Sequence, residues 1–154
     1  MKKGFTLIEL LVVISIIAIL SALLMANFIG VRQRSRDATR KSDLQNIRQA
    51  LELYRADIGS YPPSSPTNAI TCNGSLADPQ DANVVYMADV PCDPTSGSSS
   101  TTGYSYVLGG NGSYTLSACI ENAADSENTI SSCSASSDPC CSGSFHGKVT
   151  FVNP

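Results

Sequence analysis

The sequence predicts an α+β fold, in which a long N-terminal helix packs on a small antiparallel β-sheet and disulfides join the loops. Three observations carry this prediction. An apolar run fills residues 5–29, helical periodicity continues to Ile58, and the rest of the chain holds all six cysteines and several alternating segments. The expected parts are a leader at 1–4, an apolar helix at 5–30, an amphipathic helix at 31–59 and a globular head at 60–154.

The first element is an apolar stretch that carries one charge. From Phe5 to Met25 the side chains are aliphatic or aromatic apart from a few hydroxyls, and the single ionisable one is Glu9. The run is long enough to cross a bilayer, which takes about 20 apolar residues in a helix. A charge at that depth is costly unless it has a partner. Glu9 is therefore predicted to have a function.

Two simpler interpretations account for the apolar residues alone. A secretory signal peptide has an apolar core of about 7 to 15 residues that ends at a small-residue cleavage site. The run here is longer, and Leu24-Met25-Ala26 is a poor match to such a site. A plain membrane anchor is the second interpretation. Neither explains the acid.

The residues Lys2-Lys3-Gly4-Phe5-Thr6-Leu7-Ile8-Glu9-Leu10, followed by a long apolar helix, resemble the class III signal of type IV pilins and type II secretion pseudopilins. The resemblance extends from Lys2 to Leu24. It implies that a prepilin peptidase cleaves after Gly4 and methylates the new amino terminus at Phe5, while the apolar helix is kept. It also implies a subunit that waits in the cytoplasmic membrane, with its N-terminus inside, before it joins an extracellular or periplasmic filament.

Cleavage after Gly4 would place a positive amine on Phe5, one helical turn from Glu9. In a bundle of parallel staggered helices, the Glu9 carboxylate can pair with the Phe5 amine of a neighbour, so that two buried charges cancel. Polar groups buried in an apolar seam are best attested as devices that fix register. Phe5 and Glu9 are thus the predicted assembly residues. The alternative is an acid that snorkels to the interface.

Basic residues flank both ends of the apolar run. Lys2 and Lys3 favour a cytoplasmic start, but five basic residues against two acidic ones follow the other end and alone favour the opposite orientation. We expect this basic cluster to lie inside a filament or against lipid head groups. Its members are Arg32, Arg34, Arg36, Arg40 and Lys41, and the nearby acids are Asp37 and Asp43.

Beyond Gly30, apolar residues recur every three or four positions with polar ones between them, which predicts an amphipathic helix with one face on the head. Gly59 and the prolines that follow it predict the helix end. Because no proline interrupts residues 5–58, we expect one helix of about 80 Å, at about 1.5 Å per residue. The apolar face comprises Leu44, Ile47, Leu51, Tyr54 and Ile58.

The head is rich in small polar residues. It is small enough that its hydrophobic core needs additional stabilisation, for example by disulfides. Its cysteines predict three disulfides in an extracytoplasmic domain. Of the fifteen possible pairings, those that join the vicinal pair are set aside; we favour Cys72 with Cys92, and the tail pair with Cys119 and Cys133. A zinc site is the alternative, but paired C-x-x-C spacing and a second histidine are missing. The six are Cys72, Cys92, Cys119, Cys133, Cys140 and Cys141.

Three alternating segments predict strands. The first presents Tyr104, Tyr106 and Leu108 on one face, and the last runs from Lys148 to Val152. The second presents Tyr114, Leu116, Ala118 and Ile120, and the turn Gly109-Gly110-Asn111-Gly112 before it predicts a hairpin. The resulting sheet is expected to cover the apolar face of the helix.

The sequence gives little support to catalysis. His146 is the single histidine and has no obvious nucleophile or second ligand beside it. No cofactor is expected, although the resemblance to pseudopilins raises calcium, for which Glu121, Asp125 and Glu127 are candidate ligands. A solvated acidic loop is the alternative. A net charge of −3 gives no strong signal for nucleic-acid binding.

The predicted function is that of a structural pilus subunit, not an enzyme, that polymerises with itself through the N-terminal helix. The resemblance implies three further partners: prepilin peptidase, an assembly platform with its ATPase, and the membrane before assembly. Two alternatives remain open. One is the major pseudopilin of a type II secretion system or competence pseudopilus. The other is a minor tip pilin that binds DNA or a surface.

Overall fold

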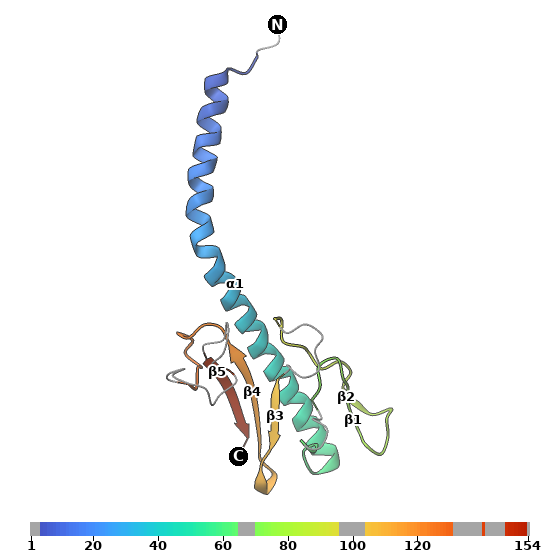
Figure 1. Ribbon diagram of the computed structural model, residues 1–154. Coiled ribbons are helices and arrows are strands. Elements are labelled where there is room, and N and C mark those ends of the chain that lie inside the picture. Colours follow the sequence, from blue (N-terminus) through green and yellow to red (C-terminus); the bar gives the residue numbers. More distant parts are fainter. Residues whose placement is uncertain (1–3, 65–69, 96–103, 131–139, 141–146, 154) are drawn as a thin grey trace. The chain divides into compact units, whose positions relative to one another are not determined.

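The computed structural model describes residues 4–64, 70–95, 104–130, 140 and 147–153, with the side chains of 23–27 left aside. Contacts divide the chain into two compact units, an N-terminal unit, Met1–Ser35, and a C-terminal unit, Arg36–Pro154. One long helix precedes all the strands, which confirms the predicted α+β class (Figure 1). The elements are α1 (Leu7–Ile58), β1 (Leu76–Ala77), β2 (Val85–Met87), β3 (Ser105–Leu108), the 3-10 turn η1 (Gly110–Gly112), β4 (Tyr114–Ile120) and β5 (Gly147–Asn153).

Helix α1 ends where the sequence predicts it to end. Gly59 follows with a φ of +85°, a left-handed conformation that glycine adopts without steric cost. Its backbone N–H donates to the Arg55 carbonyl at 2.8 Å and so satisfies one of the last free carbonyls of the helix. The single helix over 52 residues is therefore confirmed apart from its first two positions.

The main sheet is antiparallel, in the order β3-β4-β5. Tyr106 faces Leu116, which in turn faces Phe151 across the next ladder. Asn111 and Gly112 both have positive φ, 61° and 72°, which is the Asn-Gly pairing that tight hairpins favour. The predicted hairpin and final strand are both confirmed.

A second sheet, β1-β2, was not predicted from the sequence. It pairs Leu76 with Met87 and Ala77 with Val85, with an irregularity between the two pairs. Strands of two and three residues are too short to show an alternating pattern. Leu76 is nevertheless buried and contributes to the core.

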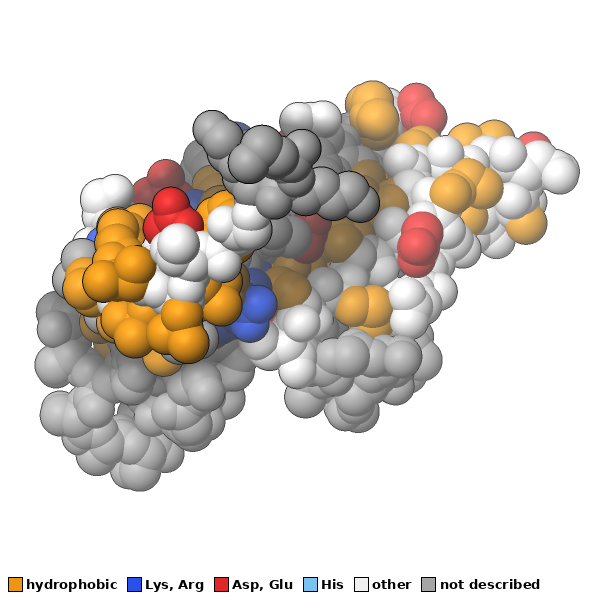
Figure 2. Space-filling view, turned by 90° about the horizontal axis from the view of Figure 1, so that it is seen from above, with side chains coloured by type: hydrophobic (Ala, Val, Ile, Leu, Met, Phe, Trp, Pro, Cys, Tyr) orange, Lys and Arg blue, Asp and Glu red, His pale blue; other side chains and the backbone are white. Residues whose placement is uncertain are grey.

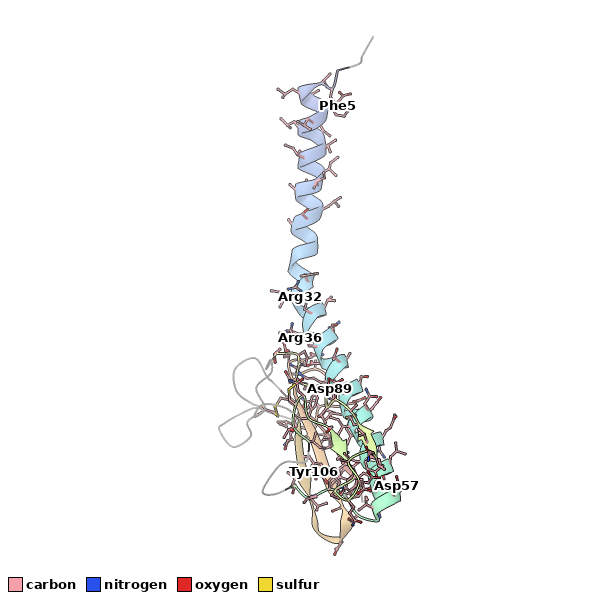
Figure 3. The ribbon with its side chains drawn as sticks, turned by 90° about the vertical axis from the view of Figure 1, so that its right-hand side faces the viewer. Phe5, Arg32, Arg36, Asp57, Asp89 and Tyr106 are labelled. Atoms are coloured by element: carbon pink, nitrogen blue, oxygen red, sulfur yellow. A yellow bond between two sulfur atoms is a disulfide. The ribbon has the colours of Figure 1, made fainter. Side chains whose placement is uncertain are left out.

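The core of the C-terminal unit lies between helix α1 and the main sheet. Leu44 and Leu51 from the helix and Leu116 and Ile120 from β4 are completely buried, so the predicted apolar faces meet. Aromatic rings fill the remaining space, and Tyr106 lies among these packed side chains (Figure 3). Three of the buried phenols donate hydrogen bonds: Tyr106 to the Pro62 carbonyl at 2.7 Å, Tyr104 to Asp43 at 2.5 Å and Tyr114 to Glu52 at 3.3 Å.

Alkaline pH should unfold this core through its tyrosines. Burial, aided by nearby Glu52, raises the pKa of Tyr114 to about 12, and burial also raises the pKa values of Tyr104 and Tyr106. Because an unfolded tyrosine ionises near about pH 10, the stability that these phenols add is complete below that pH and is lost as the pH rises through the folded values. We expect tyrosinate absorbance and loss of helical circular dichroism to develop together. Tyrosinate that forms while the helix signal persists would contradict this.

Candidate assembly site

The N-terminal unit exposes an extended apolar surface. Between residues 5 and 20, the exposed fractions of its large apolar side chains run from 46% at Val13 to 81% at Leu7. Apolar side chains gather at the free end of the helix in Figure 2. Exposed apolar patches of this size mark protein or membrane contacts.

Across the part of the chain that the structure describes, no helix has both the length and the apolar character needed to span a membrane.

Glu9 closes a capping box at the start of helix α1. The Thr6 backbone N–H and Oγ1 donate to Glu9 Oε2 at 2.9 and 2.7 Å, and the Glu9 N–H donates to Thr6 Oγ1 at 3.3 Å. This reciprocal arrangement satisfies two free N–H groups of the first turn and explains why the helix begins at Leu7. This local role of Glu9 was not predicted, although the Thr-x-x-Glu spacing is the sequence signature of a capping box.

The capping box leaves part of the Glu9 carboxylate available. Both Thr6 donors use Oε2, and no described residue donates to Oε1. The side chain borders a shallow hollow that is otherwise apolar, with Phe5, Ile8, Val12 and Val13 as its other lining residues. A cation that enters this hollow would meet the negative charge of Glu9 on an otherwise apolar surface.

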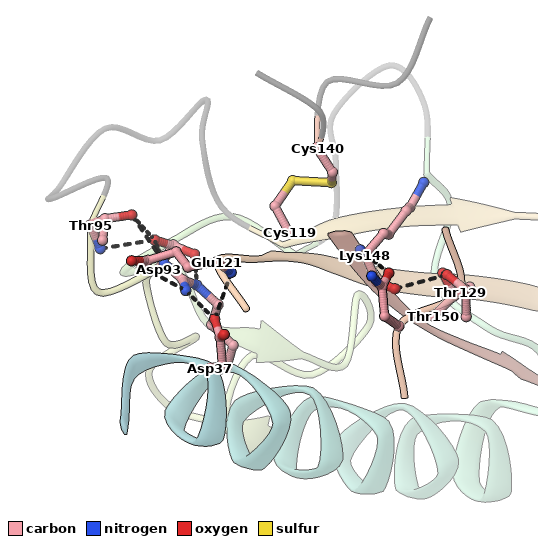
Figure 4. Close-up of a disulfide and its surroundings, with 11 residues drawn as sticks. Asp37, Asp93, Thr95, Cys119, Glu121, Thr129, Cys140, Lys148 and Thr150 are labelled. Carbon is pink, nitrogen blue, oxygen red and sulfur yellow. Dashed lines mark hydrogen bonds and ion pairs between the residues drawn. A yellow bond between two sulfur atoms is a disulfide. The ribbon is translucent and has the colours of Figure 1, made fainter. Parts of the chain in front are cut away.

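A second polar centre lies inside the C-terminal unit around Arg40, whose side chain is completely buried. Its Nε and Nη2 donate to the Asp93 carboxylate at 2.6 and 3.2 Å. Its Nη1 donates to Asp37 at 2.7 Å and to Glu121 at 3.0 Å. These four residues form the Arg40 cluster, and its acidic members are labelled in Figure 4. The cluster joins helix α1 to the loop after Cys92 and to the end of β4.

Further contacts extend the cluster along the helix. Arg36 makes a two-pronged ion pair with Glu121, and this hydrogen bonding lowers the pKa of the Glu121 carboxyl. Asp37 accepts the backbone N–H groups of Glu121 and Asn122 at 3.0 and 2.9 Å. Each residue of the Arg40 cluster therefore makes hydrogen bonds or ion pairs that join helix α1 to the loop after Cys92 or to the end of β4.

Burial favours the neutral form of Asp93, but hydrogen bonds from Arg40 and Thr95 outweigh it and lower the pKa of the carboxyl. The Thr95 N–H and Oγ1 donate to Asp93 Oδ1 at 2.8 and 2.7 Å. Asp93 is therefore held ionised, as a buried arginine requires.

Three members of the basic cluster have partners within the chain. Arg36, Arg40 and Lys41 pair with acids of their own C-terminal unit. Arg32, in the N-terminal unit, lies over the Phe28 ring at 4.4 Å. Most of the positive charge that argued for the opposite membrane orientation is thus neutralised within the folded chain.

The calcium candidates are the partners of these cations. Glu121 pairs with Arg36 and Arg40, while Lys41 Nζ lies 2.6 Å from Asp125 and 3.4 Å from Glu127. Among the residues with described positions, no group of three or more His, Cys, Asp or Glu side chains is arranged to hold a metal ion.

We expect calcium to leave the stability of the C-terminal unit unchanged, because lysine and arginine already neutralise Glu121, Asp125 and Glu127. A ligand that binds the folded state raises the melting temperature with its concentration. Thermal unfolding in EDTA and in excess CaCl₂ should therefore give the same midpoint. A midpoint that climbs as calcium is added would show that these acids exchange their cations for the metal.

Among the described cysteines, two disulfides cross-link the C-terminal unit. Cys72 pairs with Cys92, as the sequence analysis favoured, and Cys119 pairs with Cys140, one of the two tail cysteines (Figure 4). Cys133, Cys141 and His146 lie outside the described residues.

Comparison with known proteins identifies two segments. Residues 1–25 match the prokaryotic N-terminal methylation motif, and residues 27–129 match type II secretion system protein G. The type IV wide pilus major component of Thermus thermophilus is 42% identical over 84 residues, which cover 54% of this chain and 61% of that protein. The type II secretion system core protein G of Escherichia coli is 31% identical over 121 residues, which cover 75% of this chain and 79% of that protein. No solved structure gave a significant match.

The two matches meet at the apolar helix and together take in every element up to β4. The first contains Gly4, Phe5 and Glu9, and the second contains the apolar face of α1 and the Arg40 cluster. The match to protein G covers well over half of the chain, and the resemblance to pilins and pseudopilins is confirmed. The chain belongs to the type II secretion system protein G family and begins with a prokaryotic N-terminal methylation motif.

Proposed function

We propose that this chain is the structural subunit of an extracellular type IV pilus, a filament built from many copies joined through their N-terminal helices. The observation that carries the proposal is the exposed apolar surface of residues 5–20, interrupted by the single carboxylate of Glu9. Such a surface needs either lipid or copies of itself to cover it. The proposal assigns no catalytic role to the chain.

The subunit would first lie in the cytoplasmic membrane and be cleaved after Gly4 by a prepilin peptidase that also methylates Phe5. Cleavage removes Lys2 and Lys3 and leaves a positive amine one turn from Glu9. An assembly platform and its ATPase would then move the subunit from lipid into the filament. Apolar surface is covered in both places, so the ATPase and not burial would drive the transfer.

Glu9 would set the register of the polymer. An apolar helix can slide along another with little change in contact, whereas a buried carboxylate is satisfied at one stagger, where the neighbour's Phe5 amine meets it. The free Oε1 edge of the Glu9 carboxylate supports this, because it can accept a neighbour's amine while Oε2 still caps the helix.

A second candidate function is that of the major pseudopilin of a type II secretion system. The observation that favours it is coverage: the Escherichia coli core protein G aligns with 75% of this chain, against 54% for the Thermus pilus component. Both functions use the same helix and the same processing.

Fibres sheared from the surface of cells that express the chain would test the proposal. We expect electron microscopy to show filaments and mass spectrometry to identify this chain as their main component, with N-methylated Phe5 as its first residue. A mature chain that begins elsewhere would overturn the proposed processing. A deletion strain that keeps its surface fibres but fails to secrete proteins would favour the pseudopilin, and presence in only a few copies per fibre would favour a tip pilin.

A further inference from the structure

The two disulfides between described cysteines differ in how they are connected to the Arg40 cluster. Asp93 follows directly on Cys92, and Glu121 comes two residues after Cys119. Glu121, however, continues from β4, whose last residue, Ile120, is paired with Gly147 of β5. The sheet therefore holds Glu121 in place whatever the state of the Cys119–Cys140 bond.

Asp93 lies outside the strands that the structure describes. The chain before it is fastened to the turn at 71–74 by the Cys72–Cys92 bond and by two backbone hydrogen bonds, from Asn73 N–H to the Val90 carbonyl at 2.9 Å and from Val90 N–H to the Gly74 carbonyl at 2.7 Å. Beyond the disulfide, the described contacts of Asp93 are with Arg40 and Thr95. Its position thus depends on this fastening.

Arg40 cannot easily lose Asp93. The Arg40 guanidinium is completely buried and keeps its charge if Asp93 moves away. Its desolvation cost would then no longer be offset by the attraction to the Asp93 carboxylate. Interactions that stabilise the loop containing Asp93 therefore also stabilise the buried position of the Arg40 side chain. The dependence is reciprocal.

We infer that the Cys72–Cys92 disulfide is a redox-sensitive lock on the contact between helix residues 36–41 and the rest of the C-terminal unit. A dithiol supplies two electrons and two protons, so that the S–S bond breaks to give two thiols while the dithiol closes to its own disulfide. Asp93 then moves away from Arg40, and this stretch of helix opens more often. Cys92 is half-buried, whereas its partner Cys72 is buried.

The lock would close only where disulfides persist, outside the reducing cytoplasm. It does not depend on whether the chain forms pili or pseudopili, since every contact involved lies within one C-terminal unit.

Hydrogen–deuterium exchange of the full chain in detergent would test the lock. In the double variant Cys72→Ser/Cys92→Ser, we expect the amides of residues 36–41 to exchange about tenfold faster, with little change in residues 44–54, which pack on the sheet. The matched control is Cys119→Ser/Cys140→Ser, which should leave residues 36–41 unchanged because the β4-β5 ladder still positions Glu121. Reduction of the wild-type chain by dithiothreitol should reproduce the first result.

A thermodynamic cycle makes the inference falsifiable even if the variants are less stable. Asp93→Asn should speed exchange at 36–41 in the oxidised chain but add little in the Cys72→Ser/Cys92→Ser background, because both changes break one coupled contact. Simple addition of the two effects would overturn the lock. An equal loss of protection in all peptides would also overturn the lock, because the disulfide would then stabilise the whole unit and not residues 36–41 in particular.

Discussion

Arg40→Ala should destabilise the C-terminal unit by about 3–5 kcal/mol, the usual cost of removing one partner from a buried ion pair. The variant would leave Asp37 and Asp93 without the cation that pairs with them, and Glu121 with Arg36 as its remaining arginine partner. It would also remove the link that fastens the helix to the loop after Cys92. The effect should therefore exceed that of any single exposed charge on the same helix.

Urea unfolding of the full chain, followed by circular dichroism, measures this loss. The matched control is Arg48→Ala, an exposed arginine two turns further along the helix, which should change the unfolding free energy by less than about 0.5 kcal/mol. Equal effects of the two substitutions would mean that the Arg40 contacts contribute nothing beyond a surface charge.

The pH dependence adds a second signature. The pKa values of Asp93 and Glu121 are lowered in the folded chain, so their stabilisation is present above the unfolded values, near about pH 4, and is lost as the pH falls through the folded values. The difference between the wild type and Arg40→Ala should shrink over this acidic range, because protonation of the acids removes what Arg40 pairs with.

The sequence predicted the elements that repeat a pattern over many residues. Helix α1 and strands β3 to β5 each show several turns of periodicity or alternation, and the apolar faces that this periodicity assigns do meet in the core. Strands β1 and β2 are set by pairing between chain segments and not by local pattern, and they went unpredicted.

The Arg40 cluster could not be predicted from local charge counts, because Asp93 and Glu121 lie 53 and 81 residues after Arg40 along the chain. A signal was nevertheless present. Asp37 and Arg40 continue the three-and-four spacing of the buried stripe at Leu44 and Ile47. That spacing places both on the buried face, where a charge needs a partner. The sequence prediction treated Asp37 and Arg40 as charges that flank the apolar run, and so did not place them on the buried face of the helix.

Glu9→Gln should lower the yield of assembled filament by more than about tenfold, since a neighbour's Phe5 amine would be left buried without its counter-charge and each tenfold corresponds to about 1.4 kcal/mol. Glutamine is the informative replacement because it has nearly the same shape and also serves in capping boxes. The contacts with Thr6 should then persist, so the variant removes the charge while it keeps the start of helix α1.

Sheared-fibre yield and helical content should therefore separate in this variant: fewer filaments from subunits that remain as helical as the wild type. Ser15→Ala is the matched control, because the Ser15 hydroxyl bonds only to the Val12 carbonyl of its own turn, at 2.7 Å, among the described contacts. Its loss should leave assembly intact. If Glu9→Gln subunits polymerise with normal yield and stagger, the carboxylate acts solely as a helix cap. The register must then come from contacts between the C-terminal units.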